Sequence, residues 1–183
     1  MVKIPAKYLR SRTQVLSGFC RARGGATAVE FALIAPVFLA TLLAVLQTCV
    51  FLFAQATLQN AATEAARLFL TGQAQNGNLS ASQIVSQVCP TVLFNCSQMY
   101  VVVQSAASAG SLSTATPAMY NNGQPITQAG YAYDPGAPGQ IMVVQLIYAW
   151  PVIGAFGFTP ANLPNGATEM MGVSAFRVEP YQS

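Results

Sequence analysis

The longest feature of the hydrophobic pattern is an apolar run over residues 31–54, which holds 24 residues and no formal charge. A helix needs about 20 such residues to cross the hydrocarbon core of a bilayer. The run therefore predicts a membrane-spanning helix. The following residues remain rich in Ala, Leu and Gln, and Glu64 and Arg67 are spaced to pair on one helix face. Gly72 predicts the end of the helix.

The predicted helix is longer than a bilayer is thick. Residues 26–71 would extend about 69 Å at about 1.5 Å per residue, whereas the hydrocarbon core is about 30 Å thick. The remainder should project outward and carry a folded head. Pro36 lies inside the span, where it removes a backbone hydrogen bond and predicts a kink.

Beyond the helix, the pattern changes to that of a small mixed head over residues 72–183. Ser80 or Ser82 is expected to cap a short helix that runs through Val88 and ends before Pro90. Residues 105–139 are rich in Ser, Ala, Gly, Pro and Asn, and they predict a long loop with a minor hairpin.

Three further segments predict strands, at residues 99–104, 140–150 and 170–178. The second is apolar on both faces, which is typical of a central strand. We expect an antiparallel sheet of about three strands, packed on the exposed half of the long helix. The fold class is therefore α+β, and Tyr148 and Trp150 are expected to be core or interface aromatics. Arg177 and Glu179 are expected on one face of the last strand, as a solvated surface pair.

Composition supports a chain that meets lipid or other protein. Hydrophobic residues make up 53% of the sequence and charged residues only 7%, whereas an ordinary soluble domain carries about 25% charged residues. A surface so poor in charge is hard to keep soluble as a free monomer.

The charge is distributed very unevenly. Six of the eight basic residues precede residue 24, and the rest of the chain has two basic against five acidic residues. A nucleic-acid binder needs a basic stripe on its folded part, so nucleic acid is excluded as a partner. The basic cluster is instead a topology signal that keeps the N-terminus in the cytoplasm. Its members are Lys3, Lys7, Arg10, Arg12, Arg21 and Arg23.

The sequence offers no enzyme chemistry. It has no histidine to act as a base, no nucleophile elbow, no phosphate-binding loop and no paired carboxylates. Asp134 stands alone in an Asp-Pro-Gly turn sequence. We therefore expect neither catalysis nor a cofactor.

The four cysteines differ in predicted compartment. Cys20 lies in the leader and Cys49 in the span, and both are expected to be free thiols. Cys89 and Cys96 lie beyond the membrane, where an oxidising environment favours a disulfide. A structural zinc site needs four cysteine or histidine ligands, and no others are near, so no metal site is expected.

The junction before the apolar run carries a family resemblance. Residues 24–33 read Gly-Gly-Ala-Thr-Ala-Val-Glu-Phe-Ala-Leu, after a basic leader and before Pro36. With Gly25 at −1 and Glu30 at +5, the junction resembles a type IV pilin-like precursor. More narrowly it resembles the TadE-like family, the minor pilins or pseudopilins of tight-adherence (Tad/Flp) pili. The ending around Arg177 also resembles the family's Arg-Asn-Glu-Pro, with Val178 replacing the Asn.

This resemblance implies a processed, exported subunit. Residues 1–25 would be a cytoplasmic leader, which a prepilin peptidase removes between Gly25 and Ala26. The mature protein would lie in the bacterial inner membrane with its C-terminus outside, and it would initiate, cap or decorate a filament. The implied partners are the prepilin peptidase, other major and minor pilins, the inner-membrane assembly platform and the lipid bilayer.

Physical chemistry links the two ends of the junction. Cleavage would expose the α-amino group of Ala26, with an ordinary pKa of about 7.7–8.0. Glu30 follows one helical turn later in apolar surroundings, where a paired charge is tolerated and an unpaired charge is costly. Glu30 could thus pair with the amine of its own or an adjacent chain and set the register of assembly.

Alternative interpretations remain open at this point. Glu30 could be a helix-start carboxylate favoured by the helix dipole in an uncleaved bitopic protein with an extracytoplasmic binding head. A secretory signal could be cut at Ala54-Gln55-Ala56, although signal-peptide cores are only about 7–15 residues long. A lipoprotein signal at Cys20 is excluded, because Phe19 occupies a position that needs a small residue. The polar residues Gln47, Thr48 and Gln59 are either contacts between packed helices or residues that lipid tolerates.

Overall fold

The computed structural model describes residues 24–90, 93–152 and 161–179. Its longest element is helix α2, Gly24–Leu70, which contains Pro36 without interruption. The chain divides into two compact units, Met1–Gln47 and Thr48–Ser183. Within the first unit, the described residues belong to α2. Most of the predicted leader, with Cys20, lies outside the described residues.

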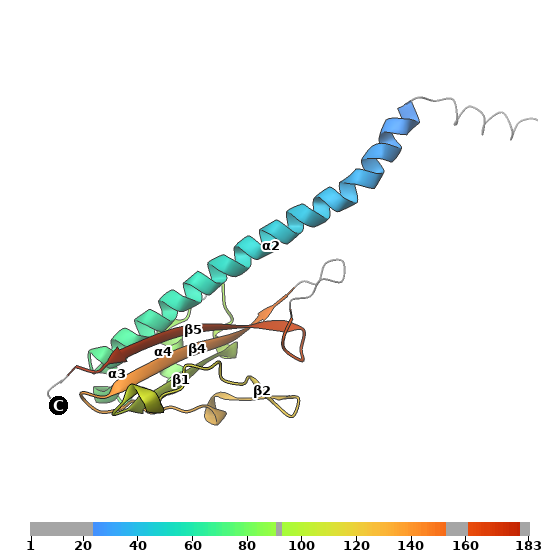
Figure 1. Cartoon of the computed structure of the whole chain (residues 1–183). Helices are drawn as coiled ribbons and strands as arrows, with labels where there is room; N and C mark the ends of the chain where they lie inside the picture. The colour runs from blue at the N-terminus through green and yellow to red at the C-terminus, as the bar shows by residue number, and fades with distance from the viewer. Residues whose placement is uncertain (1–23, 91–92, 153–160, 180–183) are drawn as a thin grey trace, which may run out of the picture. The chain divides into compact units, whose positions relative to one another are not determined.

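The second unit is built on a three-stranded antiparallel sheet (Figure 1). Its strands are β1, Met99–Ala106, β4, Ile141–Pro151, and β5, Ala167–Arg177, in the order β1-β4-β5. The central position of β4 confirms the prediction made from its two apolar faces. The α+β fold, with a long helix and a three-stranded head, is also confirmed.

Short elements fill the connections between the helix and the sheet. Strands β2 and β3 form the minor hairpin expected in the long loop, and its turn residues Asn122 and Gly123 have φ values of 49° and 77°. Two positive φ values favour the turn type that matches strand twist. The short elements are α3, Gln73–Asn76, α4, Ala81–Val88, the 3-10 helices Cys96–Gln98, Ala109–Ser111 and Gln128–Gly130, β2, Tyr120–Asn121, and β3, Gln124–Pro125.

Local sequence signals set the ends of the helices. Gly72 adopts the left-handed conformation, with φ 74°, just after α2. Ser80, rather than Ser82, caps α4: its hydroxyl accepts a bond from the Gln83 amide, and the Gln83 side chain accepts one from the Ser80 amide at 2.8 Å. This reciprocal arrangement is a capping box.

The core lies between one face of the sheet and the C-terminal part of α2 (Figure 1). Small helix residues let the backbone of α2 approach the strands, and branched residues of β1 and β4 fill the other side. The loop over residues 107–139 covers part of the opposite face, where Ala115 accepts a bond from the fully buried Gln145. The main buried residues are Ala54, Leu58, Ala61, Ala62, Ala65, Phe69, Val101, Val103, Val144, Leu146 and Met170.

Candidate functional site

The predicted processing junction lies at the start of α2. Gly25, Ala26 and Glu30 all belong to the helix, and Glu30 follows Ala26 by one turn. The Gly25 backbone and the Glu30 side chain are exposed. The helix therefore brings the predicted cut site and the carboxylate together, as the charge-pairing hypothesis requires.

The α2 residues that follow the junction present an apolar surface. Phe31 and Leu33 are each 73% exposed, whereas Leu58, later in the helix, is fully buried. Among the described residues, α2 is the one helix long and apolar enough to cross a membrane, as expected of a single-pass membrane protein. The large exposed residues are Val29, Phe31, Leu33, Ile34, Val37, Phe38, Leu39, Leu42, Leu43, Val45, Leu46, Val50, Leu52 and Phe53.

One polar group within this apolar segment, the Thr41 hydroxyl, is satisfied within the helix itself. The Thr41 hydroxyl is within hydrogen-bond distance of the Val37 and Phe38 carbonyl oxygens, at 2.9 and 2.8 Å. The Val37 and Phe38 carbonyls lie after Pro36, whereas the carbonyl that loses its helical donor at Pro36 is that of Ala32, one turn before it. The kink at Pro36 stays a prediction. Cys49 is an exposed free thiol.

Two glutamines join α2 to strand β5. The Gln55 side chain donates to the Met171 carbonyl at 2.8 Å. The side-chain carboxamide of Gln59 donates to the backbone carbonyl of Val173 at 2.6 Å. It also accepts a bond from the backbone N–H of Val173 at 3.0 Å. Gln59 thus contacts its own head, a role that the sequence analysis missed. These bonds lie in the second unit and fix the C-terminal part of α2 to the edge of the sheet.

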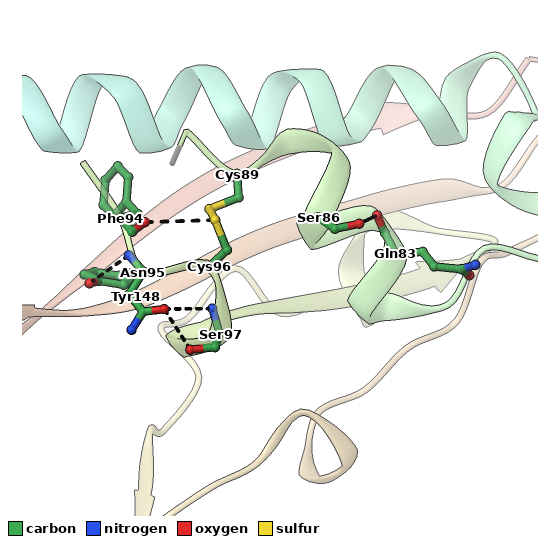
Figure 2. Close-up of a disulfide and its surroundings, with 8 residues drawn as sticks. All are labelled: Gln83, Ser86, Cys89, Phe94, Asn95, Cys96, Ser97 and Tyr148. Atoms are coloured by element: carbon green, nitrogen blue, oxygen red, sulfur yellow. Dashed lines mark hydrogen bonds between the residues drawn. A yellow bond between two sulfur atoms is a disulfide. The ribbon is translucent and has the colours of Figure 1, made fainter. Parts of the chain in front are cut away.

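A disulfide closes the segment between α4 and β1. Cys89 and Cys96 are bonded, with their Cα atoms 5.8 Å apart (Figure 2). This confirms the pairing predicted from their compartment. Asn95, next to the bridge, accepts bonds from both the amide and the hydroxyl of Ser97, at 3.2 and 2.7 Å. The bridge therefore closes a locally bonded turn.

Aromatic residues anchor this bridged segment to β4. The Phe94 ring meets Tyr148 edge to face, with centroids 4.9 Å apart, and it also contacts Trp150. The backbone N–H of Asn95 donates to the Tyr148 hydroxyl at 3.4 Å (Figure 2). Tyr148 and Trp150 are therefore core aromatics, as predicted, and they fix the bridge to the central strand.

Burial raises the pKa of three groups: Glu169 and Tyr131 lie on the sheet face opposite α2, whereas Tyr133 packs against Phe69 of α2. Burial raises the pKa of the Glu169 carboxyl, and its Oε1 is buried with no hydrogen-bond partner among the described residues. Burial, with smaller contributions from Tyr100 and Glu169, raises the pKa of Tyr131 to about 12. Burial also raises the pKa of Tyr133, whose hydroxyl donates to the Leu79 carbonyl. All three pKa shifts disfavour the charged forms.

A cavity of about 490 Å³ lies at one end of this face. Its walls come from β1, the β2–β3 hairpin and the facing ends of β4 and β5. The lining mixes tyrosine rings and amides with apolar residues, and it contains no charged side chain. The lining residues are Gln98, Tyr100, Met119, Tyr120, Pro125, Ile126, Ala149, Pro151, Val152, Asn165, Gly166 and Ala167.

Over the described part of the chain, no three histidine, cysteine, aspartate or glutamate residues come close enough to hold a metal ion. The acidic side chains are dispersed instead. Glu64 pairs with Arg67 at 3.0 Å, and Asp134 accepts from the Ser105 hydroxyl at 2.6 Å.

The family comparison addresses the α2 segment. Residues 25–67 match the family model described as TadE-like protein. This segment is TadE-like. The match begins at Gly25 and continues into the part of α2 that packs on the head, so it confirms the resemblance seen at the junction. No curated protein and no solved structure was found to match the chain. The TadE-like family is a structural family of Tad-pilus-related membrane proteins, and the match agrees with a non-catalytic role.

Proposed function

We propose that this protein is a minor pilin or pseudopilin-like subunit that takes part in assembling a Tad-type pilus. The observation that supports this most directly is the TadE-like match over residues 25–67. It falls on a helix whose N-terminal part is apolar and exposed, and whose C-terminal part carries a disulfide-closed head. The apolar part anchors the subunit in lipid and then packs against other pilin helices.

Processing after Gly25 is the first step of the proposed function. A prepilin peptidase removes the basic leader, and Ala26 becomes the mature N-terminus. Gly25 has no side chain to hinder access to the backbone, and a Cβ built there would meet no atom within 4 Å. After cleavage, the new amine and Glu30 lie one turn apart, and their pairing within or between chains sets the register of the helices.

Placement in the membrane follows from the charge distribution. The N-terminus faces the cytoplasm because the basic residues precede the span, and the head lies outside the inner membrane, where the Cys89–Cys96 disulfide persists. The assembly platform and the other pilins are the partners in this scheme.

The mass of the intact protein, extracted from membranes, tests the processing step. A mature chain beginning at Ala26 supports the proposal, and an uncleaved chain contradicts it. A chain beginning at Thr57 would instead identify a secretory signal cut after Ala56.

The cavity favours a second candidate function. An uncleaved bitopic protein could use its head to bind a ligand, and about 490 Å³ is within the range of small-molecule sites. The tyrosines and amides that line the cavity suit a neutral polar ligand. An uncleaved mass, together with ligand binding that is lost in Tyr100→Ala, would favour this candidate.

A further inference from the structure

The two outer strands of the head sheet pose a physical problem. Strands β1 and β5 are the outer strands of the three-stranded sheet, so each has an outer edge. An open edge exposes unpaired N–H and C=O groups, which can pair with a strand from another chain. Subunits held side by side through their helices would have their heads at high local concentration, which makes such pairing more favourable.

On β5, a side chain occupies the outer edge. The Gln59 carboxamide bonds both backbone groups of Val173, at 2.6 and 3.0 Å. A carboxamide carries the same donor and acceptor as a peptide group, so Gln59 occupies the place of a neighbouring strand. The Gln55 side chain donates to the Met171 carbonyl. The Asn162 side chain accepts a bond from the backbone N–H of Glu169 at 2.9 Å.

On β1, the opposite edge has the same arrangement. The Gln128 carboxamide accepts from the Val101 amide at 2.9 Å and donates to the Val101 carbonyl at 2.7 Å. Two residues further on, Val103 donates to the Ala132 carbonyl and accepts from the Asp134 amide, at 2.9 and 3.0 Å. A glutamine and a short parallel bridge thus occupy this edge.

The two glutamines form the same pattern of bonds although their sequence contexts differ. Gln59 comes from the long helix and Gln128 from a 3-10 turn, yet each forms two bonds with one valine on an outer strand. Neither glutamine completes a polar network inside the core. What they share is the occupied strand edge.

We propose that Gln59 and Gln128 are edge clamps that prevent the heads of neighbouring copies from pairing strand to strand. With both edges occupied, contact between copies is left to surfaces other than the sheet edges. The occupant excluded from each edge is a second copy of this chain, which would pair edge to edge about a two-fold axis. This inference does not depend on cleavage after Gly25.

The test uses the full chain in detergent micelles and three double variants. Gln59→Leu with Gln128→Leu removes the peptide-like groups, and leucine preserves helix propensity at residue 59. Gln59→Lys with Gln128→Lys also breaks the clamps, because an ammonium group cannot accept a bond from the valine N–H, but it places a charge beside each edge that opposes pairing. Gln73→Leu with Gln87→Leu is the matched control, since both glutamines are exposed.

Two measurements distinguish loss of the glutamine–valine bonds from pairing between copies of the chain. Hydrogen exchange in freshly diluted protein reports the clamps: the amides of Val101 and Val173 should exchange about tenfold faster in the lysine variant than in the control. The oligomeric state, measured by light scattering after subtraction of the detergent mass, reports pairing. The leucine variant should form additional concentration-dependent oligomers, whereas the lysine variant should match the control.

Two results would overturn the proposal. Unchanged exchange at both valines in the lysine variant would show that the clamps do not hold these edges. Faster exchange with a control-like size distribution in the leucine variant would show that open edges do not lead to pairing. Should the double leucine variant fail to fold, Gln128→Leu alone opens the β1 edge without altering α2, and the same two results apply to it.

Discussion

Gly172 of β5 lies directly against the backbone of Leu58 in α2. A Cβ built at residue 172 would stand 2.6 Å from the Leu58 carbonyl oxygen and 3.1 Å from the Ala62 Cβ. Real Cβ atoms essentially never approach other atoms within 3.0 Å, so only glycine fits without a shift. The two nearest atoms belong to the Leu58 backbone, which cannot rotate away as a flexible side chain could.

The first prediction concerns this contact. Gly172→Ala should destabilise the head by about 1–3 kcal/mol, because the added methyl group forces α2 away from β5. Thermal and denaturant unfolding of the solubilised full chain, followed by near-ultraviolet circular dichroism, would measure the loss. Gly110→Ala is the control, since no atom lies within 4 Å of a Cβ built there. Equal stability of the two variants would contradict this account of the helix–sheet contact.

A second prediction concerns the dependence of stability on pH. Burial raises the pKa of Glu169 above its ordinary 4.5 in the folded state, so the folded state binds more protons than the unfolded state in the window above 4.5. The free energy of unfolding should therefore fall as pH rises through that window. Glu169→Gln should remove this part of the dependence and stabilise the head at neutral pH.

Unfolding midpoints of the wild type and Glu169→Gln, compared across pH 4 to 8, provide the measurement. Tyr131 interacts electrostatically with Glu169, but its pKa is raised to about 12, so it does not titrate in that range. If the unfolding midpoints of the two proteins changed with pH in parallel, Glu169 would be ruled out as the source of the pH dependence.

A third prediction concerns the disulfide. Alkylation of the native protein without reductant should label neither Cys89 nor Cys96. Replacing both with serine should lower the free energy of unfolding by somewhat less than the about 3 kcal/mol expected of a 15-residue loop, because this loop is shorter. Cys49 is an internal control, since it is exposed and free, and it should be labelled in detergent. Labelling of all three cysteines would refute the bridge as a native feature.

Features that depend on nearby residues could be predicted from the sequence. The ends of α4 follow from Ser80 and Gln83, whose Ser-x-x-Gln spacing distinguishes Ser80 from Ser82 as the cap. The central position of β4 follows from its apolar faces, because both sides must be covered. The TadE-like resemblance could be recognised because the residues that carry it are close together in the sequence, whereas processing after Gly25 stays a prediction.

Features that depend on distant partners could not be predicted in the same way. Gln59 bonds Val173, 114 residues away, and nothing around Gln59 indicates a strand edge. Likewise, Arg177 was expected to pair with Glu179, but β5 ends at Arg177, and its Nε donates to the Gly139 carbonyl at 2.9 Å. That carbonyl comes from the connection before β4, so the tertiary fold decides the partner.

The fourth prediction tests Glu30 in its proposed role. Glu30→Gln should leave membrane insertion and the fold of the head intact, because the carboxylate is exposed. It should reduce the recovery of other pilins in pull-downs, because the charged partner of the new N-terminus is lost. Glu64→Gln is the matched control: that carboxylate is also exposed and pairs locally with Arg67. Normal recovery of partners and normal piliation by Glu30→Gln would refute the pairing.

The same experiment can separate charge pairing from a simple preference for acid near a helix start. If Glu30 acts through the α-amino group of Ala26, its effect requires cleavage. In a Gly25→Val background that the peptidase does not cut, Glu30→Gln should then cause no further loss of partner recovery. Two residues that act through one event are non-additive in this way. A further loss in the uncut background would assign Glu30 a role independent of the new N-terminus, such as the helix-dipole interaction of an uncleaved anchor.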